Sequence, residues 1–167
     1  QEGTYPLPEA QVDRFMLKIK ITYPTREEEL VIMRQNLFQD SIELKKIVSK
    51  AQVLKGRQLL KEVYLDEKIE RYILDLVFAT RNPGQFKLDK LKDLIGYGAS
   101  PRATINLAMA ARGMALLRRR GYVVPDDVRS IAQDVLRHRI AVSYEAEAEE
   151  ITSEYIIKEI LNRIEVP

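Results

Sequence analysis

The chain lacks the residue types on which several common functional sites depend. It contains no cysteine, and His138 is its only histidine among 167 residues. Without cysteine the chain can form neither a disulfide nor a thiolate metal site. One histidine without cysteine cannot build a zinc site of the ordinary type. We therefore expect no bound metal, and a structural hydrogen bond for His138.

Other absences exclude a membrane span and a complete nucleotide site. No apolar run approaches the roughly 18 residues that span a bilayer, and there is no signal sequence. No segment matches G-x-x-x-x-G-K-[ST], the loop that cradles a triphosphate. The net charge of +2, from 27 basic and 25 acidic residues, does not favour nucleic-acid binding. These features are compatible with a reducing cytosol, and we expect a cytoplasmic protein.

The composition of the chain is that of a soluble globular protein. Hydrophobic residues make up 46% and charged residues 31%, which suffices for a real core. A chain of this length is one domain, or one small domain with part of another. Because it starts at Gln1 rather than Met, we expect a piece of a longer protein, with a domain boundary between about 36 and 48.

Caps and hydrophobic periodicity predict a mostly helical chain. Thr25-Arg26-Glu27-Glu28 forms a capping box, and Asp66 suits the N-cap of the next long helix. Residues 16–21 partly alternate apolar and basic side chains, which predicts a strand. The expected fold is an all-α helical bundle with a short N-terminal helix and strand. The helices are expected over 8–15, 26–35, 50–61, 67–80, 101–120 and 125–137 and from 152 or 153 onward, with extended pieces at 63–65, 122–124 and 140–144 and an acidic linker or helical turn at 145–150.

The start of the helix at 101–120 is the first candidate site. Ser100 is a good N-cap and Pro101 suits the first helical position. Arg102 is unusual, because a cation in the first turn opposes the helix dipole. A positive helix start with an added guanidinium can receive an anion, and phosphate is the usual one. The alternative is that Arg102 pairs with a distant carboxylate, and the helix alone leaves these two interpretations about even.

Two other arginine-containing stretches have simpler explanations when each is taken alone. Arg14 ends the short first helix, where an exposed arginine would pair with Asp13 or Glu9, next to Phe15 as an anchor. The run 118–120 suits the negative end of the preceding helix, before Gly121 ends it. Contact with nucleic acid is the alternative for that run.

Two motifs together resemble one family. Residues 2–15, ending in Asp13-Arg14-Phe15, resemble the segment after sensor 1 of MoxR-type AAA+ ATPases, and residues 98–103 resemble their sensor 2 motif. Further matches follow in the family's order. They lie at 121–128, 137–140 and 144–148. The resemblance implies that residues 1–40 end an AAA+ core and that residues 41–167 form the helical lid.

The resemblance also implies an activity and its site residues. Members of the family use ATP and Mg²⁺, form rings that are usually hexamers, and are thought to act as chaperone-like machines. Their partners often carry von Willebrand factor A domains. By this resemblance Arg14 is the arginine finger, acting in trans, and Arg102 is sensor 2, acting in cis beside Ser100 and Pro101 at the nucleotide. The piece alone, without a phosphate loop, should not hydrolyse ATP.

Two alternatives stay open on the sequence. One is a helical adaptor that binds protein or nucleic acid through its basic helix, which would show salt-sensitive binding. The other keeps AAA+ but moves to magnesium-chelatase or replicative-helicase relatives, which share a Ser/Asp-Arg-Phe element. The run Thr4-Tyr5-Pro6-Leu7-Pro8-Glu9-Ala10 favours the MoxR type.

Overall fold

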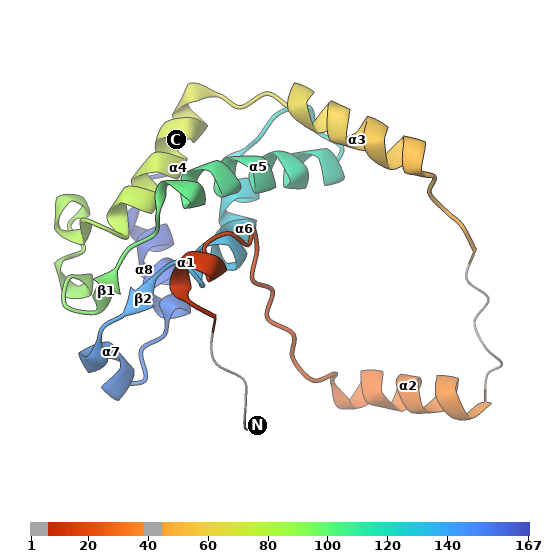
Figure 1. Cartoon of the computed structure of the whole chain (residues 1–167), viewed down its shortest axis with the longest axis horizontal. Helices are drawn as coiled ribbons and strands as arrows, with labels where there is room; N and C mark the ends of the chain where they lie inside the picture. Colours follow the sequence, from red (N-terminus) through yellow and green to blue (C-terminus); the bar gives the residue numbers. More distant parts are fainter. Residues whose placement is uncertain (1–6, 39–44) are drawn as a thin grey trace. The chain divides into compact units, whose positions relative to one another are not determined.

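The computed structural model describes residues 7–38 and 45–167, and their order along the chain is shown in Figure 1. The described residues divide into two compact units. The first contains the residues up to Lys18 together with Leu60–Pro167, and the second contains Ile19–Leu59. The expected boundary at 40/41 lies outside the described residues, so the division into core and lid stays a prediction.

The first unit is helical, which confirms the expected fold class. Most helices start at the expected caps: the Asp66 carboxylate accepts from the Lys68 N–H, and the Thr152 hydroxyl accepts from the Tyr155 N–H. The elements of this unit are α1 (Glu9–Val12), α4 (Glu67–Ala79), the 3₁₀ helices η1 (Pro83–Phe86) and η2 (Asp89–Leu91), β1 (Ile95–Tyr97), α5 (Pro101–Leu117), α6 (Pro125–Leu136), β2 (Ala141–Val142), α7 (Tyr144–Ala148) and α8 (Ser153–Arg163).

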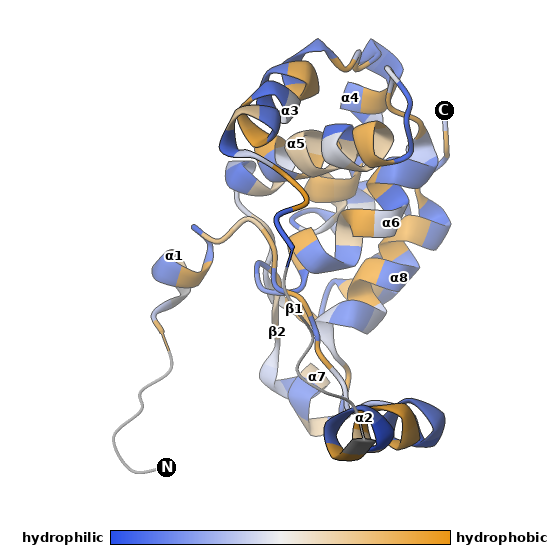
Figure 2. Ribbon diagram, turned by 90° about the vertical axis from the view of Figure 1, so that its right-hand side faces the viewer, coloured by the Kyte–Doolittle hydropathy of each residue, from blue (hydrophilic) through white to orange (hydrophobic). Residues whose placement is uncertain are grey.

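The core lies between α4, α5, α6 and α8, which Figure 2 shows stacked one against the next. Helix α5 packs against both α4 and α6. It buries Ala103, Ala111 and Ala115 completely, and these small side chains let the neighbouring helices come close. A Cβ on Gly113 of the same helix would meet open space, so this glycine is not needed for the close approach.

Helix α5 ends three residues before the expected end, at Leu117. The left-handed residue after it is Arg119, with φ of 57°, rather than Gly121. The Arg120 N–H donates to the Ala115 carbonyl and the Arg119 N–H to the Leu116 carbonyl, which is a Schellman ending. A non-glycine residue in this conformation is uncommon. The ion pairs that its neighbours make, described below, hold it there.

The strands lie partly where they were expected, since β2 falls within the extended piece at 140–144. Tyr64 and Tyr122, from the pieces at 63–65 and 122–124, form an isolated parallel bridge. Among the described residues β1 and β2 form one antiparallel pair, with Ile95 opposite Val142. Residues 16–21, for which the sequence predicts a strand, have no strand partner among the described residues. The Lys18 N–H instead donates to the Asp134 carbonyl, and the Arg137 guanidinium donates to the Lys18 carbonyl. Residues 13–18 are therefore tied to the C-terminal end of α6.

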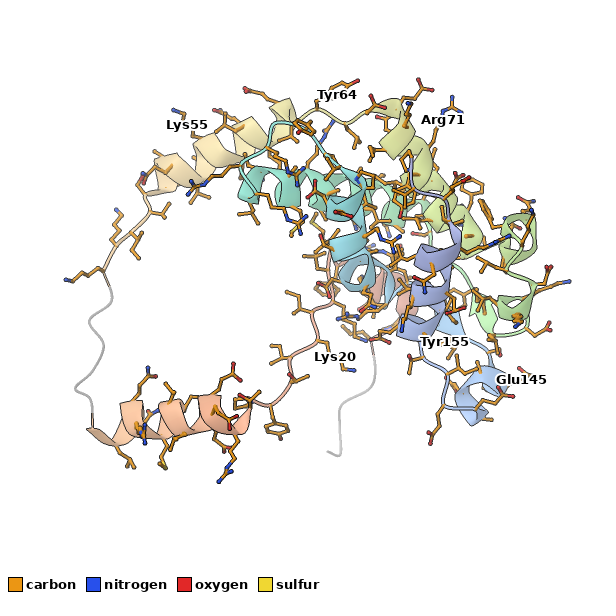
Figure 3. All side chains as sticks on the ribbon, turned by 180° about the vertical axis from the view of Figure 1, so that it is seen from behind. Lys20, Lys55, Tyr64, Arg71, Glu145 and Tyr155 are labelled. Carbon is orange, nitrogen blue, oxygen red and sulfur yellow. The ribbon has the colours of Figure 1, made fainter. Side chains whose placement is uncertain are left out.

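The second unit contains α2 (Arg26–Phe38) and the first part of α3 (Lys50–Glu62). The predicted capping box is present, since the Thr25 N–H donates to the Glu28 carboxylate at 2.8 Å. Ser49 and Gln52 make the equivalent box for α3. Helix α3 buries none of its side chains, and the described side chains of α2 are exposed and project from the ribbon in Figure 3. Within the unit, caps and local propensity account for these helices.

Candidate functional site

The N-terminus of α5 meets the residue before Arg14. The Ser100 hydroxyl lies 3.0 and 2.9 Å from the two carboxylate oxygens of Asp13, to which it donates. It also caps α5, accepting from the Arg102 N–H at 3.2 Å. The Arg102 guanidinium donates to Asp13 Oδ2 at 3.2 Å. Segments about 90 residues apart in sequence thus meet at one carboxylate.

Arg102 has a carboxylate partner and keeps an open face. Its side chain is 54% exposed, and Asp13 is its one ion-pair partner among the described residues. The carboxylate alternative from the sequence is therefore realised. Since one Nη1–H is engaged, the other donors of the guanidinium, which have no partner in the described part of the chain, can meet an anion. Pro101, beside it, is exposed as well.

The end of α4 holds the turn that leads into α5. The Thr80 hydroxyl is fully buried and accepts from the Ala99 N–H at 2.9 Å. The Arg81 guanidinium donates to the Ala99 carbonyl at 2.6 Å. A Cβ on Gly98 would lie 2.3 Å from the Thr80 carbonyl oxygen, so only glycine fits this close approach. The position of the Arg102 backbone is thereby set by α4.

Arg139, just after α6, is the buried cation that supports the site. Its side chain is fully buried, and its Nε donates to Asp13 Oδ1 at 3.1 Å. The same guanidinium donates to the backbone carbonyls of Asp13, Phe15 and Met16 at 3.0, 2.5 and 3.3 Å. It also donates to the Val135 carbonyl. One cation therefore fixes the backbone on both sides of Arg14. No local sequence pattern predicts this role for Arg139.

Arg14 carries an exposed side chain on a fixed backbone. The Asp13 carboxylate is occupied by Ser100, Arg102 and Arg139, and no described residue makes a hydrogen bond or ion pair with the Arg14 guanidinium. The expected pairing with Asp13 is therefore wrong, and the Glu9 side chain lies outside the described residues. Phe15 does not anchor the segment by its ring, which is 57% exposed, but by its carbonyl.

Electrostatics favours an ionised Asp13. Burial by itself would raise the pKa of Asp13, but the hydrogen bonds from Ser100 and Arg102 and the positive charge of Arg139 outweigh it and lower the pKa. Burial lowers the pKa of Arg139, the Asp13 charge raises it, and the nearby Arg102 charge adds to the lowering. The cluster therefore holds one negative and two positive charges.

His138 makes the structural hydrogen bond that the sequence predicted. Its Nε2 lies 3.0 Å from the Phe15 carbonyl oxygen, and because a carbonyl only accepts, Nε2 carries the proton. Burial lowers the pKa of His138, the Phe15 hydrogen bond raises it, and the charges of Arg139 and Lys18 lower it further, so the net pKa is below its ordinary value.

The lowered pKa of His138 predicts a pH dependence of stability. Below about pH 6.5 the unfolded chain binds a proton that the folded chain does not. The stability is therefore greatest above that pH and falls as the pH drops towards the lowered pKa, by up to about 1 kcal/mol per pH unit. Urea unfolding of the chain at pH 5.5 and 7.5 should show this slope, and His138→Gln should remove it. An equal slope in the variant would contradict the assignment.

The arginine run at the end of α5 is engaged by one buried acid. Asp127 is fully buried, with Oδ1 at 2.8 Å from Arg118 Nη1 and 2.5 Å from Arg120 Nη2. Its Oδ2 accepts from Arg120 Nη1 at 2.7 Å and from the Val124 N–H at 3.0 Å. Two of the three arginines therefore serve the fold, which weakens the interpretation of a basic helix that binds nucleic acid.

The described residues contain neither a cluster that could bind a metal nor a helix that could span a membrane. No group of three or more His, Asp or Glu side chains there is placed to hold a metal ion. No helix in the described part of the chain is long and apolar enough to cross a membrane.

Comparisons with known proteins agree on one family. Residues 91–160 match the AAA lid domain family. Chaperone MoxR1 of Mycobacterium tuberculosis is 40% identical over 99% of this chain and 44% of its own length. Protein MoxR of Paracoccus denitrificans is 33% identical over 86% of this chain and 45% of its own length. A solved structure from Cytophaga hutchinsonii, named a "putative ATPase", matches 100% of this chain and 51% of its own at 48% identity, with a TM-score of 0.95.

Residues 91–160, which carry Ser100, Arg102 and Arg139, are thus similar to AAA lid domains. The sequence relatives extend beyond them to the segment that carries Asp13 and Arg14. Most of the chain is similar to proteins named MoxR, as its motifs indicated. The chain spans about half the length of the curated relatives that it matches.

Proposed function

We propose that the chain is the C-terminal, lid-containing portion of a cytoplasmic ATPase that couples ATP binding and hydrolysis to chaperone-like remodelling of protein clients. One observation carries this proposal: Arg102 stands at the start of α5 on a backbone fixed by α4, with its guanidinium 54% exposed. A fixed helix start with an available guanidinium suits a phosphate group.

The cofactors and partners follow from the same proposal. ATP and Mg²⁺ would be held mainly by the part of the protein that carries a phosphate loop, because residues 1–167 contain none. The 167-residue chain alone is then expected neither to bind them stably nor to hydrolyse ATP. The full-length protein would form a ring, usually a hexamer in this family, and von Willebrand factor A domain proteins are the partners to test.

The two arginines have separate roles in the proposal. Arg102 senses the nucleotide in its own subunit, with Ser100 and Pro101 forming the turn that presents it. Arg14 enters the site of the neighbouring subunit as an arginine finger. A guanidinium suits both tasks, because it stays charged and presents a planar fork to phosphate oxygens. The exposed Arg14 side chain on a fixed backbone is the geometry that a finger requires.

Replacing Arg102 with alanine in the full-length protein tests this function. We expect ATP to bind about 10- to 100-fold more weakly, the effect of losing a charge-assisted hydrogen bond to phosphate. Titration with a fluorescent ATP analogue measures the affinity. Arg71→Ala is a matched control, because Arg71 is an exposed arginine that also has one carboxylate partner, Glu67. It lies on the outer side of α4 (Figure 3). Equal affinities in the two variants would refute the sensor role of Arg102.

A further inference from the structure

Asp13 makes two kinds of contact that differ in permanence. Its bond to Arg139 belongs to a fully buried guanidinium that also holds three backbone carbonyls of the same segment. Its bond to Arg102 is a single contact of 3.2 Å to a side chain that is 54% exposed. An exposed ion pair of this kind contributes little free energy. Arg102 can therefore leave at small cost, while Arg139 stays.

The charges of the cluster also permit Arg102 to leave. With Arg102 bound, one carboxylate faces two guanidinium groups, and the Arg102 charge disfavours the charged form of Arg139. Without Arg102, the Asp13–Arg139 pair is balanced and still hydrogen-bonded. A phosphate that offers two or three oxygens to the Arg102 fork would be a stronger partner than a single carboxylate oxygen.

Because Asp13 is next to Arg14 in the chain, the release of Arg102 from Asp13 can affect Arg14. Asp13 is joined by one peptide bond to Arg14, and the carbonyls of Asp13 and Phe15 on either side are held by Arg139. When Arg102 leaves, Asp13 loses one of its three side-chain partners, and its carboxylate is free to shift against Ser100 and Arg139. Such a shift acts on the backbone that carries Arg14.

We propose that Asp13 is a positioning residue that links the two arginines. It holds Arg102 while no nucleotide is bound, releases it to phosphate, and passes that change to Arg14. In a ring this connects the nucleotide state of one site to the finger that acts on another. The inference rests on the proposed function, because it needs Arg102 to bind nucleotide.

The test uses AMP-PNP, a non-hydrolysable ATP analogue, with the full-length protein and a double-mutant cycle. In Asp13→Asn the neutral side chain competes less for Arg102, so AMP-PNP should bind about two- to fivefold more tightly, which is the effect of losing an exposed ion pair. In the Arg102→Ala background the same change should leave the affinity unaltered. A purely structural role predicts the opposite sign, since a damaged site binds more weakly.

A second measurement needs no variant of Asp13. Hydrogen exchange over residues 10–18 of the full-length protein should increase on saturation with AMP-PNP, and Arg102→Ala should abolish the increase. The inference is overturned if Asp13→Asn binds AMP-PNP with unchanged or lower affinity. It is also overturned if AMP-PNP does not change hydrogen exchange over residues 10–18. If Arg102→Ala binds AMP-PNP as tightly as wild type, the proposed function itself fails, which is a separate result.

Discussion

Replacement of Arg14 by alanine is expected to lower the ATPase kcat of the full-length protein by about 10³-fold or more, within the range for an arginine finger. The fold should survive, because the Arg14 side chain is exposed and has no hydrogen-bond partner among the described residues. The contacts that hold the segment come from its neighbours Asp13 and Phe15. Steady-state hydrolysis and circular dichroism melting measure the two effects separately.

The trans action of Arg14 needs its own control. Lysine at this position keeps the charge but loses the planar fork, so Arg14→Lys should recover little of the rate. Subunits with Arg14→Ala can be mixed with subunits whose phosphate loop is disabled. Mixed rings should regain activity, since the second subunit supplies the finger that the first one lacks. Failure to regain activity, or a normal rate in Arg14→Ala rings, would remove Arg14 from the site.

Local chemistry predicted the helix starts well. Ser100, Asp66 and Thr25 each cap the helix that follows them, because a cap depends on hydrogen bonds within three or four residues. Proline at the first position of α5 and α6 added an equally local signal. The ends were less certain, and α5 ends at Leu117, before the arginines that Asp127 holds.

Long-range pairing could not be predicted from the chain alone. The stretch from Ala99 to Tyr122 contains five arginines and no acid, so their carboxylate partners had to come from elsewhere. Asp13 supplies the partner of Arg102 and Asp127 that of Arg118 and Arg120, and neither acid has a local sequence pattern that would identify it. The short strands β1 and β2 are stable only as a pair within the packed unit. The extended piece expected at 140–144 contains β2, whereas β1 is too short for periodicity to show.

The two interpretations of Arg102 do not exclude each other. An exposed ion pair with Asp13 occupies one donor, and the same side chain can turn to a stronger anion when one is present. On the sequence alone, a carboxylate partner and a phosphate partner are competing explanations of Arg102. The structure makes them competing partners of one guanidinium, which is the basis of the inferred role of Asp13.

Asp127 should matter more for stability than any other acid of the lid. Burial would raise its pKa, but the hydrogen bonds from Arg120 and the Val124 N–H and the charges of Arg120 and Arg118 lower it below the ordinary value of 3.8. Its contribution is therefore present above about pH 4 and lost as the pH falls through the lowered pKa.

Asp127→Ala is expected to lower the free energy of unfolding of the chain by about 3 kcal/mol, which urea unfolding at pH 7 measures. The change leaves Arg118 and Arg120 without their acid and removes the cap on the Val124 N–H. This loss of unfolding free energy is at the low end for breaking a buried ion pair, because both arginines are partly exposed and can be hydrated once Asp127 is removed. Asp126→Ala, one residue earlier and exposed, is the matched control and should cost less than about 1 kcal/mol. Equal losses in the two variants would mean that the helix dipole, and not the arginine pair, accounts for the effect.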